Sequence, residues 1–362
     1  MLVDRRRRWG RDRTWCTWET EELRFAELAS RRWWEWRTCR GGAQAVHRTA
    51  RFPYLHIDSC ALYDSVLDRL QRDPRVELRT GERVLEVREA PGGPEVVTDR
   101  ETFCAAYAID ALGPRSPLIH DDPPPATVLA QRFLGWEVEA DAPAFDSSVV
   151  TLMDFRPAES GALTFLYVLP FTSTRALVEH TTIGADAEPG PSLRRRRALL
   201  DAELGERLAI RQWRVLHEER GEIPMAAPGG RRVPAGRVLA VGAAAGAIRP
   251  SSGYAFSRTQ RHVRQVARAI SAGTPVPHGS GLARLAVMDR IFLAALSEQA
   301  DHGEELLWQL ARGSGADGFA RFMTDVSTPV DEARILRALP ASTMTAVTLR
   351  LLARRSLPAP WG

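Results

Sequence analysis

A short segment near residue 240 places the tightest constraint on the fold of this chain. The apolar run Val238–Val241 ends abruptly at Gly242, and after small residues the sequence Pro250–Tyr254 leads into a helical pattern that continues to about Ile270. Glycines let a backbone approach a ligand closely, and a helix N-terminus offers unpaired N–H groups and the positive end of a dipole. The segment therefore predicts an α/β domain that holds a phosphate-bearing ligand; the alternative is an ordinary strand–turn–helix unit.

The composition narrows the class of protein. The 362 residues suffice for two domains, and 44% hydrophobic and 26% charged residues are ordinary for a globular chain. The net charge is +4, every basic residue other than histidine is arginine, and runs such as Arg5–Arg8 and Arg194–Arg197 lie in no nucleic-acid-binding motif. Solvated surfaces explain these runs, so we expect no nucleic-acid partner. The four widely spaced cysteines fit neither a zinc site nor a disulfide framework, so we expect reduced thiols and no metal.

Hydropathy argues against a membrane span. No window reaches the roughly 18–20 apolar residues that a spanning helix needs, and no apolar segment follows Arg5–Arg8 as a signal peptide requires. If the protein meets a membrane, we expect it to lie on the surface.

The pattern along the chain divides it into three parts. The first part is basic and tryptophan-rich, with loops and helices expected around Trp9–Trp36, a helix over Tyr63–Gln71 and short strands up to Asp110. The sequence Asp122–Pro125 reads as a stiff linker. We predict a ligand-binding domain over residues 1–120 and 235–275, a β-sheet domain over 121–234, and a helical C-terminal region over 276–362. The sheet rests on four strand-like segments rich in β-branched and aromatic residues: Gln131–Val138, Val149–Asp154, Leu163–Leu169 and Arg175–Ile183.

Three groups of segments together point to a family. They are Arg13–Trp18; Phe165–Pro170 with Arg175–Thr181; and Gly221–Met225 with Val241–Gly246 and Pro250–Tyr254. In this order and spacing they resemble the lycopene β-cyclase family of FAD proteins. Ala243 follows Gly242 where flavin monooxygenases and geranylgeranyl reductases usually carry Asp, which favours the cyclases. Arg249 departs from the His that is usual in the family, so no role is transferred to it.

The resemblance implies a fold and a set of cofactor residues. The fold is α/β (mixed α+β): a Rossmann-like FAD-binding domain of the flavin monooxygenase and geranylgeranyl reductase type, an antiparallel-sheet substrate domain and a helical C-terminal region. Positions that match the family's cofactor motifs are Asp4, Asp110, Gly113, Gly242, Gly246, Pro250, Ser251, Gly253 and Tyr254.

The beginning of the chain is unusual for this family. Family members start with a strand, a G-x-G-x-x-G turn and a helix, and an acidic residue about 20 residues beyond the glycines binds the ribose. Asp4 matches that acidic residue, but the glycine fingerprint is absent from the sequence. We therefore expect about thirty further residues upstream, enough for the first part of a βαβ unit, and weak FAD binding without them.

The resemblance also implies a reaction. Lycopene, or a related acyclic carotenoid, is cyclised without net redox change while FAD is kept reduced by NAD(P)H. Glu179 matches the family's essential acidic residue, and burial beside Leu177 and Val178 would raise its pKa and keep it protonated. The alternative is a plain surface carboxylate. We expect a cytoplasmic protein, peripheral to the inner face of the cell membrane.

Other residues leave alternatives open. Phe165, Tyr167 and Phe171 either line a tunnel for the polyene or fill a core, and His180 either bonds Glu179 or lies at the surface. For Asp154 and Arg156 a structural ion pair is the simplest account. The rival functions are another FAD enzyme of this fold (a monooxygenase or a prenyl reductase), an inactive remnant, or a carotenoid-binding module.

Overall fold

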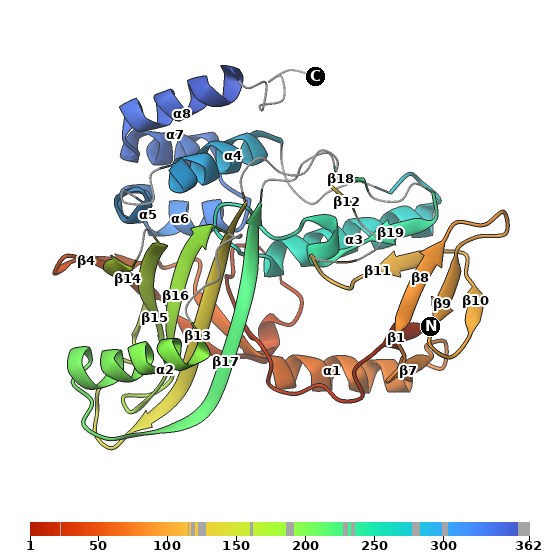
Figure 1. Cartoon of the computed structure of the whole chain (residues 1–362), viewed down its shortest axis with the longest axis horizontal. Helices are drawn as coiled ribbons and strands as arrows, with labels where there is room; N and C mark the ends of the chain where they lie inside the picture. Colours follow the sequence, from red (N-terminus) through yellow and green to blue (C-terminus); the bar gives the residue numbers. More distant parts are fainter. Residues whose placement is uncertain are drawn as a thin grey trace.

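The computed structural model describes most of the chain, and its architecture has two β-rich parts and a group of helices (Figure 1). The described residues are 1–21, 23–114, 116, 120–121, 128–159, 162–185, 192–226, 231–232, 236–276, 283–298 and 303–353. The predicted linker Asp122–Pro125 lies outside them.

A seven-stranded sheet forms the larger part. Its order is β17-β13-β16-β15-β14-β4-β5, and neighbouring strands are antiparallel except for the parallel pair β14–β4. In that order the strands are Trp213–Ala226, Val128–Ala140, Arg175–Ala185, Ala162–Pro170, Val149–Glu159, Glu35–Arg40 and Ala43–Arg48. The sheet predicted over residues 121–234 thus contains two more strands than expected, β4 and β5, which come from the first part of the chain. Most residues of the central strands β15 and β16 are buried, so both faces of the sheet are covered there.

The second part contains short parallel pairs, as expected for a ligand-binding α/β domain. β1 (Leu2–Asp4) pairs with β7 (Leu78–Thr80), and β11 (Ala108–Asp110) pairs with β19 (Val238–Ala240). Two antiparallel sheets accompany them: β8 (Val84–Arg88), β9 (Glu95–Thr98) and β10 (Thr102–Cys104); and β2 (Thr14–Trp18), β6 (Tyr54–Asp58) and β3 (Ala29–Trp33). The two-residue strands β12 (His120–Asp121) and β18 (Arg231–Arg232) pair with each other.

The helices fall into three positions. α1 (Ser59–Arg72) and α3 (Phe256–Ala272) lie with the parallel pairs, and α2 (Leu193–Ala202) crosses one face of the large sheet (Figure 1). Asp58 caps α1 by accepting hydrogen bonds from Cys60 N and Ala61 N. The C-terminal helices gather at one end of the large sheet: α4 (Ala283–Glu298), α5 (Gly303–Ser314), α6 (Ala316–Met323), α7 (Pro329–Ala338) and α8 (Ala341–Ala353). Short turns complete the set: 3₁₀ helices at Ala26–Leu28 and Gly242–Ala245 and a π-helical turn at Glu203–Arg207.

Two apolar cores lie on opposite faces of the large sheet. One packs Leu134, Leu166 and Val178 under α2 with Leu200. The other joins the opposite face to the tryptophan-rich strands and to helices α4–α8. Within the described residues, no helix combines the length and apolarity that crossing a bilayer would need.

The prediction of loops and helices around Trp9–Trp36 is wrong. This region forms strands β2 and β3 and the start of β4. Trp18, Trp33 and Trp36 are at most 2% exposed and belong to the larger core. Each of these three strands has only one fully buried tryptophan, and most of its other residues are small or polar. The period-two pattern of a strand is therefore easily missed in the sequence.

Candidate active-site cavity

A cavity of about 1050 Å³ lies where the large sheet, the glycine-rich segment and the C-terminal helices meet. Residues of the first part of the chain, among them Thr14, Cys16, Trp18, Tyr54 and Gly113, line it together with three further groups. The sheet contributes Gln131, Phe133, Phe165, Tyr167, Glu179, Ile183, Glu219, Gly221 and Ile223; the glycine-rich segment contributes Val241, Gly242, Ala243, Ile248 and Ser251–Phe256; the helices contribute Met288, Asp289, Phe292, Leu307, Phe319, Ile335 and Leu339 among others. Its walls are therefore mainly apolar, with few polar groups, as in sites for large apolar ligands.

The sheet presents one row of residues at the floor of the cavity. Strand pairing places Gly135 on β13 opposite Glu179 on β16 and opposite Glu219 on β17, and Tyr167 on β15 opposite Glu179. Because residues paired across a sheet point to the same face, the four positions form one line in the order Glu219, Gly135, Glu179, Tyr167. The two acidic side chains, which both line the cavity, thus flank a glycine of the sheet.

Glu179 lies in an apolar setting with a single hydrogen bond in the described structure that involves its carboxylate. It is 8% exposed, and the Thr181 hydroxyl donates to its Oε1 at 2.8 Å. Burial, with the negative charge of Glu219 as the second cause, raises the pKa of Glu179 to about 8. A carboxyl group of this kind holds its proton at neutral pH.

Glu219 has a more polar setting. The Thr14 hydroxyl donates to Glu219 Oε2 at 2.7 Å, and the residue is 7% exposed. Burial raises the pKa of Glu219, while the bond from Thr14 and the positive charge of Arg11 act in the opposite direction. The two carboxyl groups of the row therefore have unequal surroundings.

Three tyrosines meet beside this row. The Tyr54 hydroxyl is 3.0 Å from the Tyr167 hydroxyl and 2.8 Å from the Tyr254 hydroxyl. Tyr54 also lies against Trp18, with ring centroids 4.5 Å apart. Burial raises the pKa of each phenol, and burial raises that of the Cys16 thiol to about 12. The phenols and the thiol stay neutral at physiological pH, and the three tyrosines offer electron-rich rings to the cavity.

The glycine-rich segment has the predicted strand–turn–helix form. Gly242 (φ 62°) and Gly246 (φ 75°) adopt the left-handed conformation that other residues avoid, on either side of a 3₁₀ turn. The turn from Arg249 to Tyr254 is closed by Arg249 N donating to Tyr254 O at 2.8 Å and Gly253 N donating to Arg249 O at 2.8 Å. No side chain caps the N-terminus of α3, which begins at Phe256 beside the cavity. This cradle of backbone suits an anionic group such as the pyrophosphate of FAD.

The other predicted cofactor residues divide into two groups. Gly113 (φ 109°), Ser251, Gly253 and Tyr254 line the cavity together with Gly242. Asp4, Asp110, Gly246 and Pro250 do not line it. Asp110 instead holds the turn after β11, accepting hydrogen bonds from Leu112 N at 2.8 Å and the Ser116 hydroxyl at 2.5 Å. Asp4 ends β1, where it is bound by Arg6 at 2.9 Å.

The predicted substrate residues also divide. Phe165 and Tyr167 line the cavity. Phe171 instead packs against Trp33 and His56, with ring centroids 6.3 Å and 5.0 Å away. His180 is buried on the opposite face of β16 from Glu179, because neighbouring residues of a strand point to opposite sides. Arg156 forms the expected ion pair with Asp154 at 2.6 Å and a second with Glu203 at 2.9 Å.

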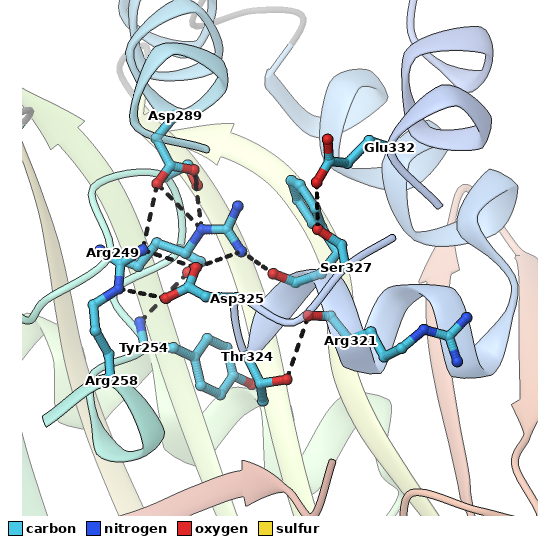
Figure 2. Close-up of polar contacts among 12 residues, drawn as sticks. Arg249, Tyr254, Arg258, Asp289, Arg321, Thr324, Asp325, Ser327 and Glu332 are labelled. Carbon is cyan, nitrogen blue, oxygen red and sulfur yellow. Dashed lines mark hydrogen bonds and ion pairs between the residues drawn. The ribbon is translucent and has the colours of Figure 1, made fainter. Parts of the chain in front are cut away.

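A network of buried charges joins the glycine-rich segment to the helices (Figure 2). Arg249 Nε lies 3.0 Å from Asp289 Oδ1 on α4, and the Ser251 hydroxyl donates to the same oxygen at 2.6 Å. Arg258 on α3 forms a two-point pair with Asp325, at 2.5 Å and 2.8 Å. Arg249 also donates to the carbonyl oxygen of Phe322 and is 1% exposed. The network fixes the Arg249–Tyr254 turn against the helices, and it is a feature that our sequence analysis did not assign.

Sequence reasoning missed the cavity residues Glu219 and Tyr54, and it missed Gly135, which lies between Glu179 and Glu219 on the sheet. Glu219, Gly135 and Tyr54 carry no motif of their own, and only their neighbours Gly221–Met225 entered the resemblance. The register of β13 against β17, which is a long-range property, is what brings Glu219 to Glu179. Among the residues that the structure describes, no group of three His, Cys, Asp or Glu side chains is arranged to hold a metal ion, and the four cysteines are free.

Comparison with known proteins identifies relatives of this chain. The family model described as "Lycopene cyclase protein" matches residues 2–349. A lycopene beta cyclase from the chloroplast of Arabidopsis thaliana is 32% identical over 197 residues, which is 51% of this chain and 38% of that protein. The match therefore spans less than two fifths of the length of that curated relative.

Solved structures share the fold at low sequence identity. A flavoprotein/dehydrogenase from Cytophaga hutchinsonii superposes with a TM-score of 0.58 at 12% identity, covering 88% of this chain and 82% of the other. A geranylgeranyl bacteriochlorophyll reductase-like protein from Thermoplasma acidophilum gives a TM-score of 0.52 at 14% identity, covering 90% and 84%. These structures confirm the predicted fold class.

Proposed function

The chain belongs to the lycopene cyclase family, and from this premise we propose that it is a carotenoid cyclase that closes the ψ end groups of lycopene, or of a related acyclic carotenoid, into β-rings. A proton adds to the terminal C=C bond, a second C=C bond attacks the resulting tertiary carbocation to close the ring, and loss of another proton sets the ring double bond. The sum is a redox-neutral isomerisation. It requires an acid, a pocket without water and walls that tolerate a cation.

The observation that carries this proposal is the position of Glu179. Its carboxyl group is buried at the floor of a large apolar cavity, and its pKa is raised to about 8. A carboxylic acid that keeps its proton at neutral pH, next to room for an apolar ligand, meets the first requirement. Glu179 is the acid that we propose delivers the proton.

The walls meet the other requirements. The rings of Trp18, Phe165 and Tyr254 line the cavity, and Phe292 and Phe319 extend this lining toward the helices. Aromatic rings attract a cation through their electron-rich faces. The three neutral tyrosine hydroxyls satisfy one another, so they do not offer a strong nucleophile that would capture the carbocation.

We propose FAD as the cofactor, with NAD(P)H as the source of electrons for its reduction. Gly242, Ser251 and Gly253 border the part of the cavity beside the start of α3, and these residues would hold the flavin nucleotide there. When bound in its reduced form, the flavin supplies electron density that stabilises positive charge. The chain's own contribution is to position the ligand and to exclude water.

The apolar substrate motivates a proposal about location. Val330, Leu336, Leu349 and Leu352 on α7 and α8 are each more than half exposed, and Leu336 also lines the cavity. We propose that this surface contacts the inner face of the cell membrane, from which the carotenoid enters, and that the protein is otherwise cytoplasmic. An exposed apolar surface beside an entrance is suited to a lipid surface.

The test is to express the chain in bacteria that accumulate lycopene and to analyse the carotenoids by chromatography and mass spectrometry. We expect a cyclised product whose mass equals that of lycopene. A product with an added oxygen atom would identify a monooxygenase, and one with two added hydrogen atoms a prenyl reductase. Unchanged lycopene with a folded, flavin-loaded protein would contradict the proposal.

A control separates catalysis from carotenoid binding. Glu179→Gln should retain bound lycopene in the purified protein but form no ring. If the substituted protein still forms rings at the same rate, Glu179 is not the acid. If neither protein forms rings but both bind carotenoid equally, a binding module is the better account.

A further inference from the structure

Two carboxyl groups, rather than one, lie at the floor of the cavity. Glu179 and Glu219 both line it, and both are at most 8% exposed. They are on strands β16 and β17, which do not pair with each other because β13 lies between them. Only the residue of β13 at the same level decides whether the two side chains can approach.

That residue is Gly135, and it leaves the gap open. It is paired with Glu179 on one side and with Glu219 on the other. A Cβ atom at Gly135 would lie 3.1 Å from Leu177 Cδ1, 3.3 Å from Glu219 Cγ and 3.4 Å from Glu179 Cβ, so these three side chains already surround the position. Gly135 has no positive φ, so its backbone conformation does not require glycine. The close side chains leave little room for a Cβ atom, and this is what favours glycine here.

From this geometry we propose that Glu179 and Glu219 form one functional pair across Gly135, in which Glu219 carries the negative charge that keeps the proton on Glu179. This inference rests on the proposed function, in which Glu179 is the acid. Glu219 is a positioning residue in it: the Glu219 charge acts on Glu179 and not on the substrate.

The surroundings favour Glu219 as the ionised member. The Thr14 hydroxyl donates to it at 2.7 Å, and the positive charge of Arg11 favours its ionised form. Arg11 also binds Asp58 at 2.9 Å and the buried Glu137. Among the described residues, the groups that shift the pKa of Glu179 are Glu219 and Thr181, and neither is basic. Two like charges in one low-dielectric site do not both ionise at the same pH, so the proton stays on the member without cationic support.

Titratable and polar groups from several elements surround the two carboxyl groups. Those around Glu179 are Glu219 on β17, Thr181 on β16, Cys16 on β2, Tyr167 on β15 and Tyr254 in the glycine-rich segment. Those around Glu219 are Thr14, Arg11, Glu137 on β13 and Asp58 at the end of β6. Cys16 and the tyrosines remain neutral over the physiological range, because burial raises the pKa of each, so they do not titrate with the pair.

The direct test is to titrate the carboxyl groups in the purified chain, with no carotenoid present. The carbonyl stretch of protonated carboxyl groups, followed by infrared difference spectroscopy against pH, should contain a component that vanishes in Glu179→Gln. In Glu219→Gln the midpoint of that component should fall by about one pH unit, because a neighbouring negative charge is lost. In Glu219→Asp, which keeps the charge, the midpoint should stay near that of the native chain.

Two further substitutions test the gap itself. Gly135→Ala places a methyl group between the two side chains, so the midpoint of Glu179 should fall in the same direction by a smaller amount. The matched control is Gly184→Ala on the same sheet, whose new Cβ would meet only Ala162 Cβ at an ordinary 3.5 Å. Glu218→Gln, on the opposite face of β17, is the control for Glu219→Gln, because Glu218 pairs with Arg197 at 2.7 Å away from the cavity.

The outcomes separate this inference from the proposed function. An unchanged midpoint in Glu219→Gln, with the native fold retained, would overturn the pair even if the native chain cyclises lycopene. A midpoint that falls in Glu219→Gln but not in Glu218→Gln would support the pair even if no carotenoid is cyclised. In a chain that does cyclise, the basic limb of the rate-against-pH profile should shift to lower pH by the same amount. If Glu219→Gln fails to fold, the Gly135→Ala and Gly184→Ala comparison decides.

Discussion

Two groups of buried charges border the same cavity, and they are built in opposite ways. At the sheet, Glu179 and Glu219 bring two acidic groups together over a glycine. At the helices, Arg249 and Arg258 alternate with Asp289 and Asp325, so each charge has an opposite neighbour (Figure 2). Burial costs free energy in both places, but only the second arrangement offsets it with attraction between charges.

The difference distinguishes a reactive site at the sheet from a structural ion-pair network at the helices. Burial alone raises the pKa of Asp325, but hydrogen bonds from Arg258 and the charge of Arg249 outweigh it, so the pKa of Asp325 lies below its ordinary value. The pKa of Glu179 moves the other way, to about 8. A carboxyl group that its surroundings leave uncompensated can give up a proton near neutral pH, whereas one held by two arginines cannot. The pKa shifts of Glu179 and Asp325 have opposite directions, and they therefore distinguish the two roles.

The largest expected effect is on the reaction. Glu179→Gln removes the proton donor but keeps the shape of the side chain, so cyclisation should fall by a factor of about 100 or more. The fold should be retained, because the amide is neutral and close in shape to the protonated carboxyl group that it replaces. Ring formation per folded protein, measured against Glu218→Gln, checks this. An activity in Glu179→Gln close to that of the control would mean that the sheet cluster is structural after all.

The next effect is on stability and concerns the helices. Asp289→Asn leaves the guanidinium of Arg249 buried without its main carboxylate partner, which should lower the free energy of unfolding by about 3–5 kcal/mol. Urea denaturation provides the measurement. The control is Glu298→Gln, which breaks the exposed pair with Arg350 and should cost less than about 1 kcal/mol. Equal small losses in the free energy of unfolding in both variants would mean that the buried network stabilises the fold no more than a surface ion pair does.

The pH dependence of stability should differ between the two groups. The pKa of Glu179 is 4.5 when unperturbed and about 8 in the folded chain, so the native state binds the extra proton over this window. Stability should therefore decline as pH rises from about 5 to about 8, by about 3 kcal/mol, and Glu179→Gln should decline less. Asp325 has a lowered pKa, so its contribution is present above pH 3.8 and lost as pH falls.

Urea denaturation at a series of pH values checks both slopes. Asp325→Asn should reduce the loss of stability on the acid side, and Glu179→Gln the loss on the basic side. The same slope in the native chain and in Glu179→Gln would show that the Glu179 carboxyl ionises as it does in water.

The smallest expected effect concerns one hydroxyl. The Thr181 hydroxyl donates to Glu179 Oε1 at 2.8 Å and acts to lower the pKa of that group. Thr181→Val removes the bond with little change of shape, so the pKa should rise by about half a unit and the basic limb of the activity profile should move to higher pH. A shift to lower pH would contradict the assignment of this hydrogen bond.

Local sequence patterns were enough for the parts of the fold that depend on nearby residues. The strand–turn–helix around Gly242, α1, the strands β13 to β16 and the C-terminal helices follow from periodicity and breakers, whereas the long strand β17 was not predicted. Glu179 and Tyr254 were named from motifs, and the structure places both at one cavity. The roles of these residues stay predictions that the experiments above address.

Long-range contacts account for what the sequence did not reveal. Glu219 reaches Glu179 only through the register of two strands that are far apart in the chain, with Gly135 between them. Arg249 has its structural role because it pairs with Asp289, which lies on a helix that no sequence motif connects to Arg249. The tryptophan strands were missed because each has a single fully buried tryptophan among mostly small or polar residues. Strands β4 and β5 join the large sheet through a parallel pairing that periodicity does not specify.

The central claim, that Glu179 protonates the substrate in a redox-neutral cyclisation, is tested most directly by carrying out the reaction in heavy water. The account predicts one deuterium atom in the product for each ring formed, because the acid exchanges its proton with solvent before delivering it, and no ring formation by Glu179→Gln. Rings formed without deuterium, or rings formed with deuterium at an undiminished rate by Glu179→Gln, would contradict it.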